Sequence, residues 1–167
     1  MRRKFRVADK LGIMPNQLFD EIAAAIENYA ATAQNRAAAE RFAAELIASR
    51  LEHYNWTGFY WVDPRDAEML ELGEFVGAPT EHTRIPVSRG ICGAAVAQGK
   101  TIVVDDVHSD PRYLACSIET KSEIVVPIEV NGKIVGEIDI DSHIPAAFDA
   151  ADRAFLERCA KSFARFF

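Results

Sequence analysis

Residues 122–140 read SEIVVPIEVNGKIVGEIDI, and this stretch decides the fold of the chain. Two runs rich in β-branched residues, Ser122 to Val130 and Lys133 to Ile140, flank the dipeptide Asn131-Gly132. Asn-Gly between apolar runs is a strong signal for a two-residue hairpin turn, because both residues tolerate the positive φ that the turn needs. The stretch therefore predicts a pair of antiparallel strands.

A second hairpin is predicted upstream of the first. Residues 56–62, WTGFYWV, are aromatic and β-branched, Asp63 to Asp66 favour a turn, and Met69 to Gly73 continue as the returning strand. Three shorter elements are predicted between the hairpins: an extended piece at 83–87, a small helix at 91–98 closed by Gly99, and a strand at 101–104. These elements indicate a sheet that is mostly antiparallel.

Helices are predicted at both ends of the chain, near 15–29, at 33–53 and at 150–166 with Asp149 as cap. The fold class is therefore α/β of the α+β type, a central, mostly antiparallel sheet sandwiched between N- and C-terminal helices and connecting helices and loops. We expect residues 1–32 to be a helical extension and 33–167 to form the domain. The Ala-rich helix at 33–53 suits either packing on the domain's own sheet or a homodimer.

Composition narrows the function classes. The chain has 167 residues and a net charge of −6, which disfavours nucleic acid and anionic membranes as partners. No run approaches the roughly 20 apolar residues that cross a bilayer. The basic N-terminus is not followed by the apolar stretch of a secretory signal. Three cysteines are too few for a secreted disulfide scaffold, so we expect a reducing, cytoplasmic location.

Each cysteine has its own context. Cys92 follows Arg89-Gly90 at the start of the short helix, where helix amides and a cation lower a thiol's pKa; it also suits a small buried core residue. Cys116 lies in a loop between strands, a common place for reactive residues. Cys159 falls on the apolar stripe of the last helix.

Acidic residues gather at the ends of the first hairpin. Asp139 and Asp141 alternate with isoleucine and so share a face, and the Asn-Gly turn brings Glu123 across from them. Carboxylates crowded in this way repel one another, so a pKa rises or a cation binds between them. A ligand ammonium, a metal or a proton would each serve, whereas the plain alternative is a solvated outer face.

Aromatic residues suggest a pocket wall. Trp56 and Tyr60 share one face of their strand, and Phe59 between them suits the core. His82, His108 and His143 have no spacing typical of a metal site, so no metal ligand is predicted from them.

Taken in order, several motifs resemble free methionine-(R)-sulfoxide reductases, a GAF-domain family. The resemblance runs from Asn55 to the final helix. The matching stretches are NWTGFY at 55–60, RIPVSRGICG at 84–93, DDVH at 105–108, Ala115-Cys116, SEIVVP at 122–127, DIDS at 139–142 and Phe148-Asp149.

The resemblance implies an enzyme without a cofactor that reduces free methionine sulfoxide. Cys116 would attack the sulfoxide and become a sulfenic acid, Cys92 would form a disulfide with it, and a thioredoxin-like reductant would restore both thiols. The substrate ammonium would bind Glu123, Asp139 and Asp141, one of which would donate a proton, and Trp56 and Tyr60 would line the methionine side chain.

One position departs from the family pattern. The family's first cysteine, its usual resolving thiol, falls at His82, and histidine cannot form a disulfide. Either Cys92 resolves the sulfenic acid, or the recycling route is lost. Two other readings therefore stay open: a non-catalytic GAF sensor or binding domain for a methionine-like ligand, and a redox-sensor thiol protein that needs the cysteines but not the acids.

Overall fold

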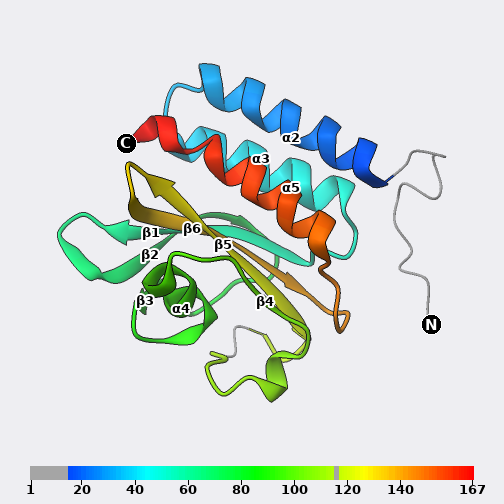
Figure 1. Cartoon of the computed structure of the whole chain (residues 1–167), viewed down its shortest axis with the longest axis vertical. Helices are drawn as coiled ribbons and strands as arrows, with labels where there is room; N and C mark the ends of the chain where they lie inside the picture. Colours follow the sequence, from blue (N-terminus) through cyan, green and yellow to red (C-terminus); the bar gives the residue numbers. More distant parts are fainter. Residues whose placement is uncertain (1–14, 115–116) are drawn as a thin grey trace.

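The computed structural model describes residues 15–114 and 117–167 (Figure 1). Its centre is a six-stranded sheet of order β3-β2-β1-β6-β5-β4, with every neighbouring pair antiparallel. The strands are β1 (Trp56–Asp63), β2 (Asp66–Val76), β3 (Arg84–Pro86), β4 (Ile102–Val104), β5 (Ser122–Val130) and β6 (Lys133–Ser142). The predicted Asn-Gly hairpin is confirmed: it joins β5 to β6, and Asn131 and Gly132 have φ of 52° and 80°.

Helices cover both faces of the sheet. The longer ones are α2 (Pro15–Thr32), α3 (Arg36–Arg50) and α5 (Ala150–Lys161), while α4 (Gly90–Gln98) and the 3-10 turns η1 (Val107–Ser109) and η2 (Ala164–Phe166) are short. Figure 1 shows α3 and α5 on one face with α2 above them, and α4 beneath the sheet. The predicted α+β sandwich is thereby confirmed. No helix in the described ranges is long and apolar enough to span a membrane.

The N-terminal helices pack inside the chain. Helix α3 contacts β1 and β2, so its packing on the domain's own sheet is confirmed, and α2 contacts α3 and α5. Whether α3 also forms a dimer stays a prediction, as does the domain boundary between residues 32 and 33. Asn35 caps α3 by accepting a hydrogen bond from the Ala38 amide at 2.9 Å.

The final helix is shorter than predicted. Asp149 caps it as expected, in a capping box with Asp152, but α5 ends at Lys161 rather than near residue 166. The chain turns at Ser162, and the Phe163 ring enters the core with its centroid 4.7 Å from that of Phe59. Burial of that ring outweighs continuation of the helix.

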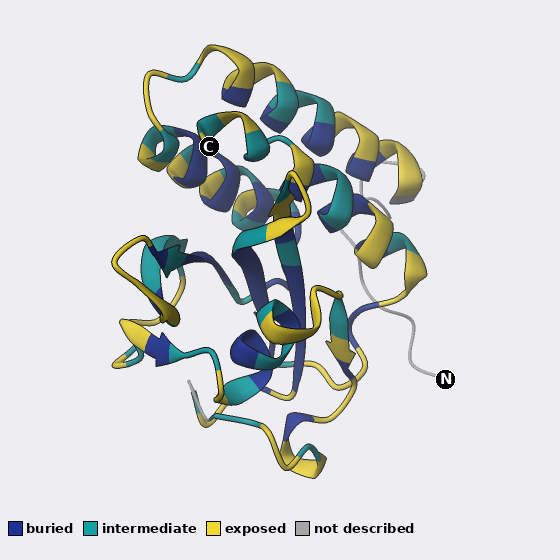
Figure 2. Ribbon diagram, turned by 60° about the vertical axis from the view of Figure 1, so that its left-hand side comes forward, coloured by how far each residue is buried: buried dark blue, intermediate teal, exposed yellow. Residues whose placement is uncertain are grey.

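Strand alternation divides the interior into two cores. In β6, Ile138 and Ile140 face the long helices, whereas the acidic residues between them face α4. In β1, Phe59 joins the helix-side core, as predicted, and Tyr60 joins the core under α4. Figure 2 shows buried residues along the sheet and on the sides of the helices that face it. The acidic residues of β6 and the Tyr60 ring therefore share the α4 side of the sheet.

Candidate functional site

The β5–β6 hairpin brings the predicted acids together. Glu123 pairs with Asp141 across the two strands, and Asp139 is two residues further along the same face. Their exposed fractions are 5%, 4% and 2%, respectively. The solvated outer face that the sequence left open is therefore wrong, because all three carboxylates are buried beneath α4.

A fourth acid, Glu137, extends this face, and it was not predicted from the sequence. It precedes Asp139 by two residues on β6 and is completely buried. Neither of its carboxylate oxygens has a hydrogen-bond partner among the described residues. The same alternation that paired Asp139 with Asp141 would have found it.

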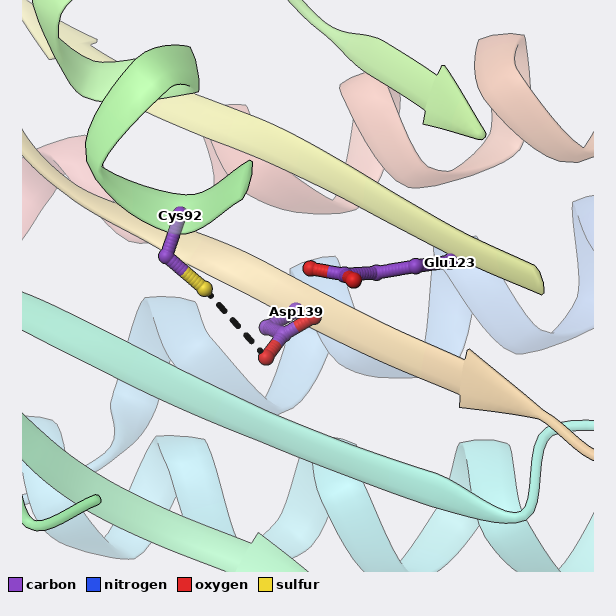
Figure 3. A group of neighbouring side chains, drawn as sticks. All are labelled: Cys92, Glu123 and Asp139. Atoms are coloured by element: carbon purple, nitrogen blue, oxygen red, sulfur yellow. Dashed lines mark hydrogen bonds between the residues drawn. The ribbon is translucent and has the colours of Figure 1, made fainter. Parts of the chain in front are cut away.

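Helix α4 places Cys92 above these acids. Its Sγ donates a hydrogen bond of 3.5 Å to Oδ2 of Asp139. The sulfur and one carboxylate oxygen from each of Glu123 and Asp139 all lie within 4.8 Å of one another. In Figure 3, Cys92 descends from α4 toward Asp139, while Glu123 reaches across from β5. The alternative of a small buried core residue is confirmed for Cys92, and its thiol is also in direct contact with the acidic face.

Burial dominates the electrostatics of the acids. Desolvation raises the pKa of Glu137 to about 8. Desolvation, together with repulsion from Glu137, raises the pKa of Asp139 to about 8 as well. Desolvation also raises the pKa of Glu123 and Asp141 well above the usual value, reinforced by repulsion from Asp139. The predicted rise is confirmed, and at neutral pH this face holds protons.

The same surroundings correct the expectation for Cys92. A helix start and a nearby arginine predicted a lowered pKa for its thiol. Burial instead raises the pKa of Cys92 well above its usual value, and the charges of Asp139, Glu137 and Glu123 raise it further. At neutral pH Cys92 is therefore a protonated thiol and a poor nucleophile.

Aromatic rings from β1 wall the acidic face. The rings of Trp56 and Tyr60 lie 6.3 Å apart at an interplanar angle of 25°, so the predicted shared face is confirmed. Trp56 Nε1 donates to the Ala78 carbonyl at 3.1 Å, and the Tyr60 hydroxyl donates to the His82 carbonyl at 2.8 Å. Across β1 and β6, Trp56 pairs with Asp141, so the indole stands beside the outer acid.

Gly58 makes room for that indole. It lies between Trp56 and Tyr60 on β1 and pairs with Asp139. A Cβ at Gly58 would come within 2.3 Å of Trp56 Cη2 and 2.9 Å of Phe75 Cβ. The absence of a side chain therefore lets the indole lie flat against the strand.

The outer end of the acidic face opens into a narrow cavity of about 60 Å³. Trp56 and Asp141 belong to its lining, and the other lining residues are Asn55, Ala78, Thr80, Ser117, Glu119, Thr120 and His143. Since each water of the liquid occupies about 30 Å³, only a few fit. In this conformation the cavity is smaller than an amino acid.

The remaining predicted residues fall in different places. Cys116 lies outside the described residues. Cys159 is completely buried in the helix-side core, whereas Cys92 belongs to the core under α4, so the sheet separates them. His108 is exposed and His143 is half-buried, and neither joins the cysteine–acid cluster in the described part of the chain.

Comparison with known proteins shows the family of this chain. The sequence matches the GAF domain family over residues 16–165. It is 36% identical over 143 residues to the free methionine-R-sulfoxide reductase of Escherichia coli, covering 86% of this chain and 80% of that protein.

Two solved structures extend the comparison to the fold. The free methionine-R-sulfoxide reductase of Neisseria meningitidis, in complex with its substrate, has a TM-score of 0.85 at 36% identity, covering 99% of this chain and 95% of that chain. The fRMsr of Staphylococcus aureus, also in complex with substrate, has a TM-score of 0.78 at 32% identity and covers 99% of both chains. The chain therefore belongs to the GAF-domain family and, within it, to the group formed by the free methionine-R-sulfoxide reductases and their relatives.

Proposed function

We propose that this protein reduces free methionine (R)-S-oxide to methionine, with Cys116 as the nucleophile. The observation that carries the proposal is the buried acidic face of Glu123, Asp139 and Asp141 beside the Trp56 indole. A face of this kind suits a small zwitterion that has a cationic ammonium at one end and an apolar thioether at the other.

The acids have two roles in this proposal. The ammonium of the substrate gives the crowded carboxylates a counter-charge that they otherwise lack, so binding lowers their mutual repulsion. A carboxyl group with a pKa of about 8, such as Asp139, also holds a proton at neutral pH and is suited to donate it to the sulfoxide oxygen. One cluster of acids thus binds the ammonium of the free amino acid and also supplies the proton donor.

The chemical step balances around a single oxygen atom. The Cys116 thiolate attacks the sulfoxide, the S–O bond of the substrate breaks, and a new S–O bond forms on Cys116 as a sulfenic acid. The substrate sulfur gains the two electrons that the cysteine sulfur loses. One proton from the acidic face completes the sulfenic hydroxyl, and methionine leaves.

Cys92 is proposed to complete the cycle. Its thiol condenses with the sulfenic acid of Cys116, forming a disulfide and releasing water. A raised pKa suits this later role better than the first attack, because Cys92 remains a thiol until the sulfenic acid has formed. A thioredoxin-like reductant then restores both thiols, which fits a cytoplasmic enzyme, and His82 takes no part in the disulfide.

One observation favours a second candidate function. Where the family pattern has its first cysteine this chain has His82, so one thiol of the usual cycle is missing. A domain that keeps the acidic face and the aromatic wall but recycles poorly would bind a methionine-like ligand as a sensor. Such a protein would bind methionine sulfoxide saturably without releasing methionine.

A single-turnover assay tests the proposal. The fully reduced protein is mixed with methionine (R)-S-oxide without reductant, and methionine release is followed. Cys116→Ser should abolish release, and Asp139→Asn should slow it about 100-fold or more. Cys159→Ser is the control and should match the wild type. Release of one equivalent by Cys116→Ser would overturn the nucleophile assignment, and normal release by Asp139→Asn would overturn the acidic pocket.

A further inference from the structure

We propose that the cluster of Cys92, Glu123 and Asp139 is also a binding site for one zinc-class divalent cation. One ligand atom from each residue lies within 4.8 Å of the other two, so small side-chain movements would bring all three within about 2.0–2.3 Å of one zinc ion. The three side chains come from α4, β5 and β6 and converge on one point, as Figure 3 shows. All three are buried, unlike the acidic groups that gather on protein surfaces.

Unpartnered oxygens around the cluster give a second indication. Oδ1 of Asp139 and both carboxylate oxygens of Glu137 are buried without a hydrogen-bond partner among the described residues. Buried polar atoms normally have partners, because leaving them unpaired costs about 1–3 kcal/mol or more for charged groups. A cation next to Asp139 would supply a positive partner for these oxygens.

The donor set selects the kind of metal. A thiolate with two carboxylates suits zinc, which accepts sulfur and oxygen ligands in a four-coordinate site. Magnesium and calcium prefer oxygen ligands alone, usually six or more for calcium, and so disfavour the Cys92 sulfur. Three protein ligands leave one position, for water or for the Glu137 carboxylate.

Binding of the ion is an exchange of protons without redox change. The cation displaces the thiol proton of Cys92 and any protons held by Glu123 and Asp139, and these protons leave to solvent. Affinity should therefore increase with pH. Because the same carboxylates are the ones assigned to the substrate ammonium, the ion and methionine sulfoxide should compete; this consequence alone rests on the proposed function.

Cobalt(II) provides a direct probe, because a thiolate-bound cobalt ion has a near-ultraviolet charge-transfer band. We expect the reduced wild-type protein to take up one Co²⁺ with this band and to lose it when Zn²⁺ is added. Cys92→Ser should remove the band, whereas Cys116→Ser and Cys159→Ser should keep it. Asp139→Asn and Glu123→Gln should weaken binding about 100-fold or more, since even an outer-shell partner is worth about 10–100-fold.

Several outcomes would overturn the site. A band that persists in Cys92→Ser, or undiminished affinity in Asp139→Asn, would place the metal elsewhere. If those variants do not fold, Zn²⁺ should still slow alkylation of Cys92 in the wild-type protein, measured by peptide mass spectrometry, and an unchanged rate would count against the site. None of these measurements uses methionine sulfoxide, so they test the metal site even if the reductase proposal fails.

Discussion

Replacing the buried Glu137 by glutamine should stabilise the fold, and increasingly so as the pH rises. Glutamine has nearly the shape of glutamate but no charge. Glu137 is completely buried and neither carboxylate oxygen has a hydrogen-bond partner among the described residues, so burial raises its pKa more than the nearby Cys92 thiol lowers it. Removing the ionisable group should therefore stabilise the fold most at the pH values at which the carboxyl would otherwise be charged.

The size of the effect follows from the pKa of Glu137, which burial raises from the usual 4.5 to about 8. Between these two values the folded chain holds a proton that the unfolded chain has released, so the free energy of unfolding falls as the pH rises. A shift of this size corresponds to at most about 5 kcal/mol, reached above pH 8 and absent near pH 4. Relaxation around the carboxyl should reduce this to a few kcal/mol.

Denaturant unfolding at pH 5, 7 and 9 measures the prediction. The difference in unfolding free energy between Glu137→Gln and wild type should be small at pH 5 and should favour the variant by a few kcal/mol at pH 9. Glu129→Gln, an exposed position on β5 of the same hairpin, is the matched control and should change little at any pH. A difference that is the same at all three pH values would refute the buried-charge reasoning.

Three further predictions concern the cysteine, the aromatic wall and the capping acid. Cys92→Ser should keep the first turnover of methionine release but slow recycling by thioredoxin, and unchanged recycling would exclude Cys92 as the resolving thiol. Gly58→Ala should displace the Trp56 indole, whose Cη2 would lie 2.3 Å from the new Cβ, lowering stability by about 1–3 kcal/mol and raising KM for methionine sulfoxide; unaltered stability and KM would show that the indole has room. Asp152→Asn should lower stability by about 2 kcal/mol at pH 7, because hydrogen bonds hold the pKa of that carboxyl at about 2 despite its burial. That stabilisation is lost as the pH falls from about 4 to 2, so a loss that persists undiminished at pH 2 would contradict the reasoning.

The hairpin shows what local sequence determines. Asn131-Gly132 fixes the turn and sets Val130 opposite Lys133, but a bulge between Ile128 and Glu129 then shifts the register by one residue and so sets Glu123 opposite Asp141. Because strand alternation has a period of two, the common face of Asp139 and Asp141 followed from the sequence alone, whereas the place of Glu123 on that face depends on the bulge. Glu137 follows the same rule, but a single glutamate in an alternating strand is usually solvent-exposed, and its burial depends on the packing of elements distant in sequence, including α4.

The pKa of Cys92 could not be predicted from its neighbours in sequence. A short helix and Arg89 indicate a lowered value, yet Arg89 is exposed and the thiol faces acids that follow it by 31 to 47 residues in the chain. The end of α5 was predicted wrongly for a similar reason, because Phe163 packs against Phe59 on β1, a strand far away in the sequence. Contacts between residues distant in sequence decide the pKa of a thiol and the end of a helix in this chain, and local sequence patterns do not predict those contacts.

The most direct test of the proposed function is turnover of the separate diastereomers of free methionine sulfoxide with thioredoxin, thioredoxin reductase and NADPH. The proposed function predicts methionine release from the R form, no release from the S form, and no reduction of methionine sulfoxide within a peptide. Reduction of neither diastereomer, under conditions where an active reductase of the family turns over, would contradict it. Saturable binding of the R form without release would then assign the protein to ligand sensing.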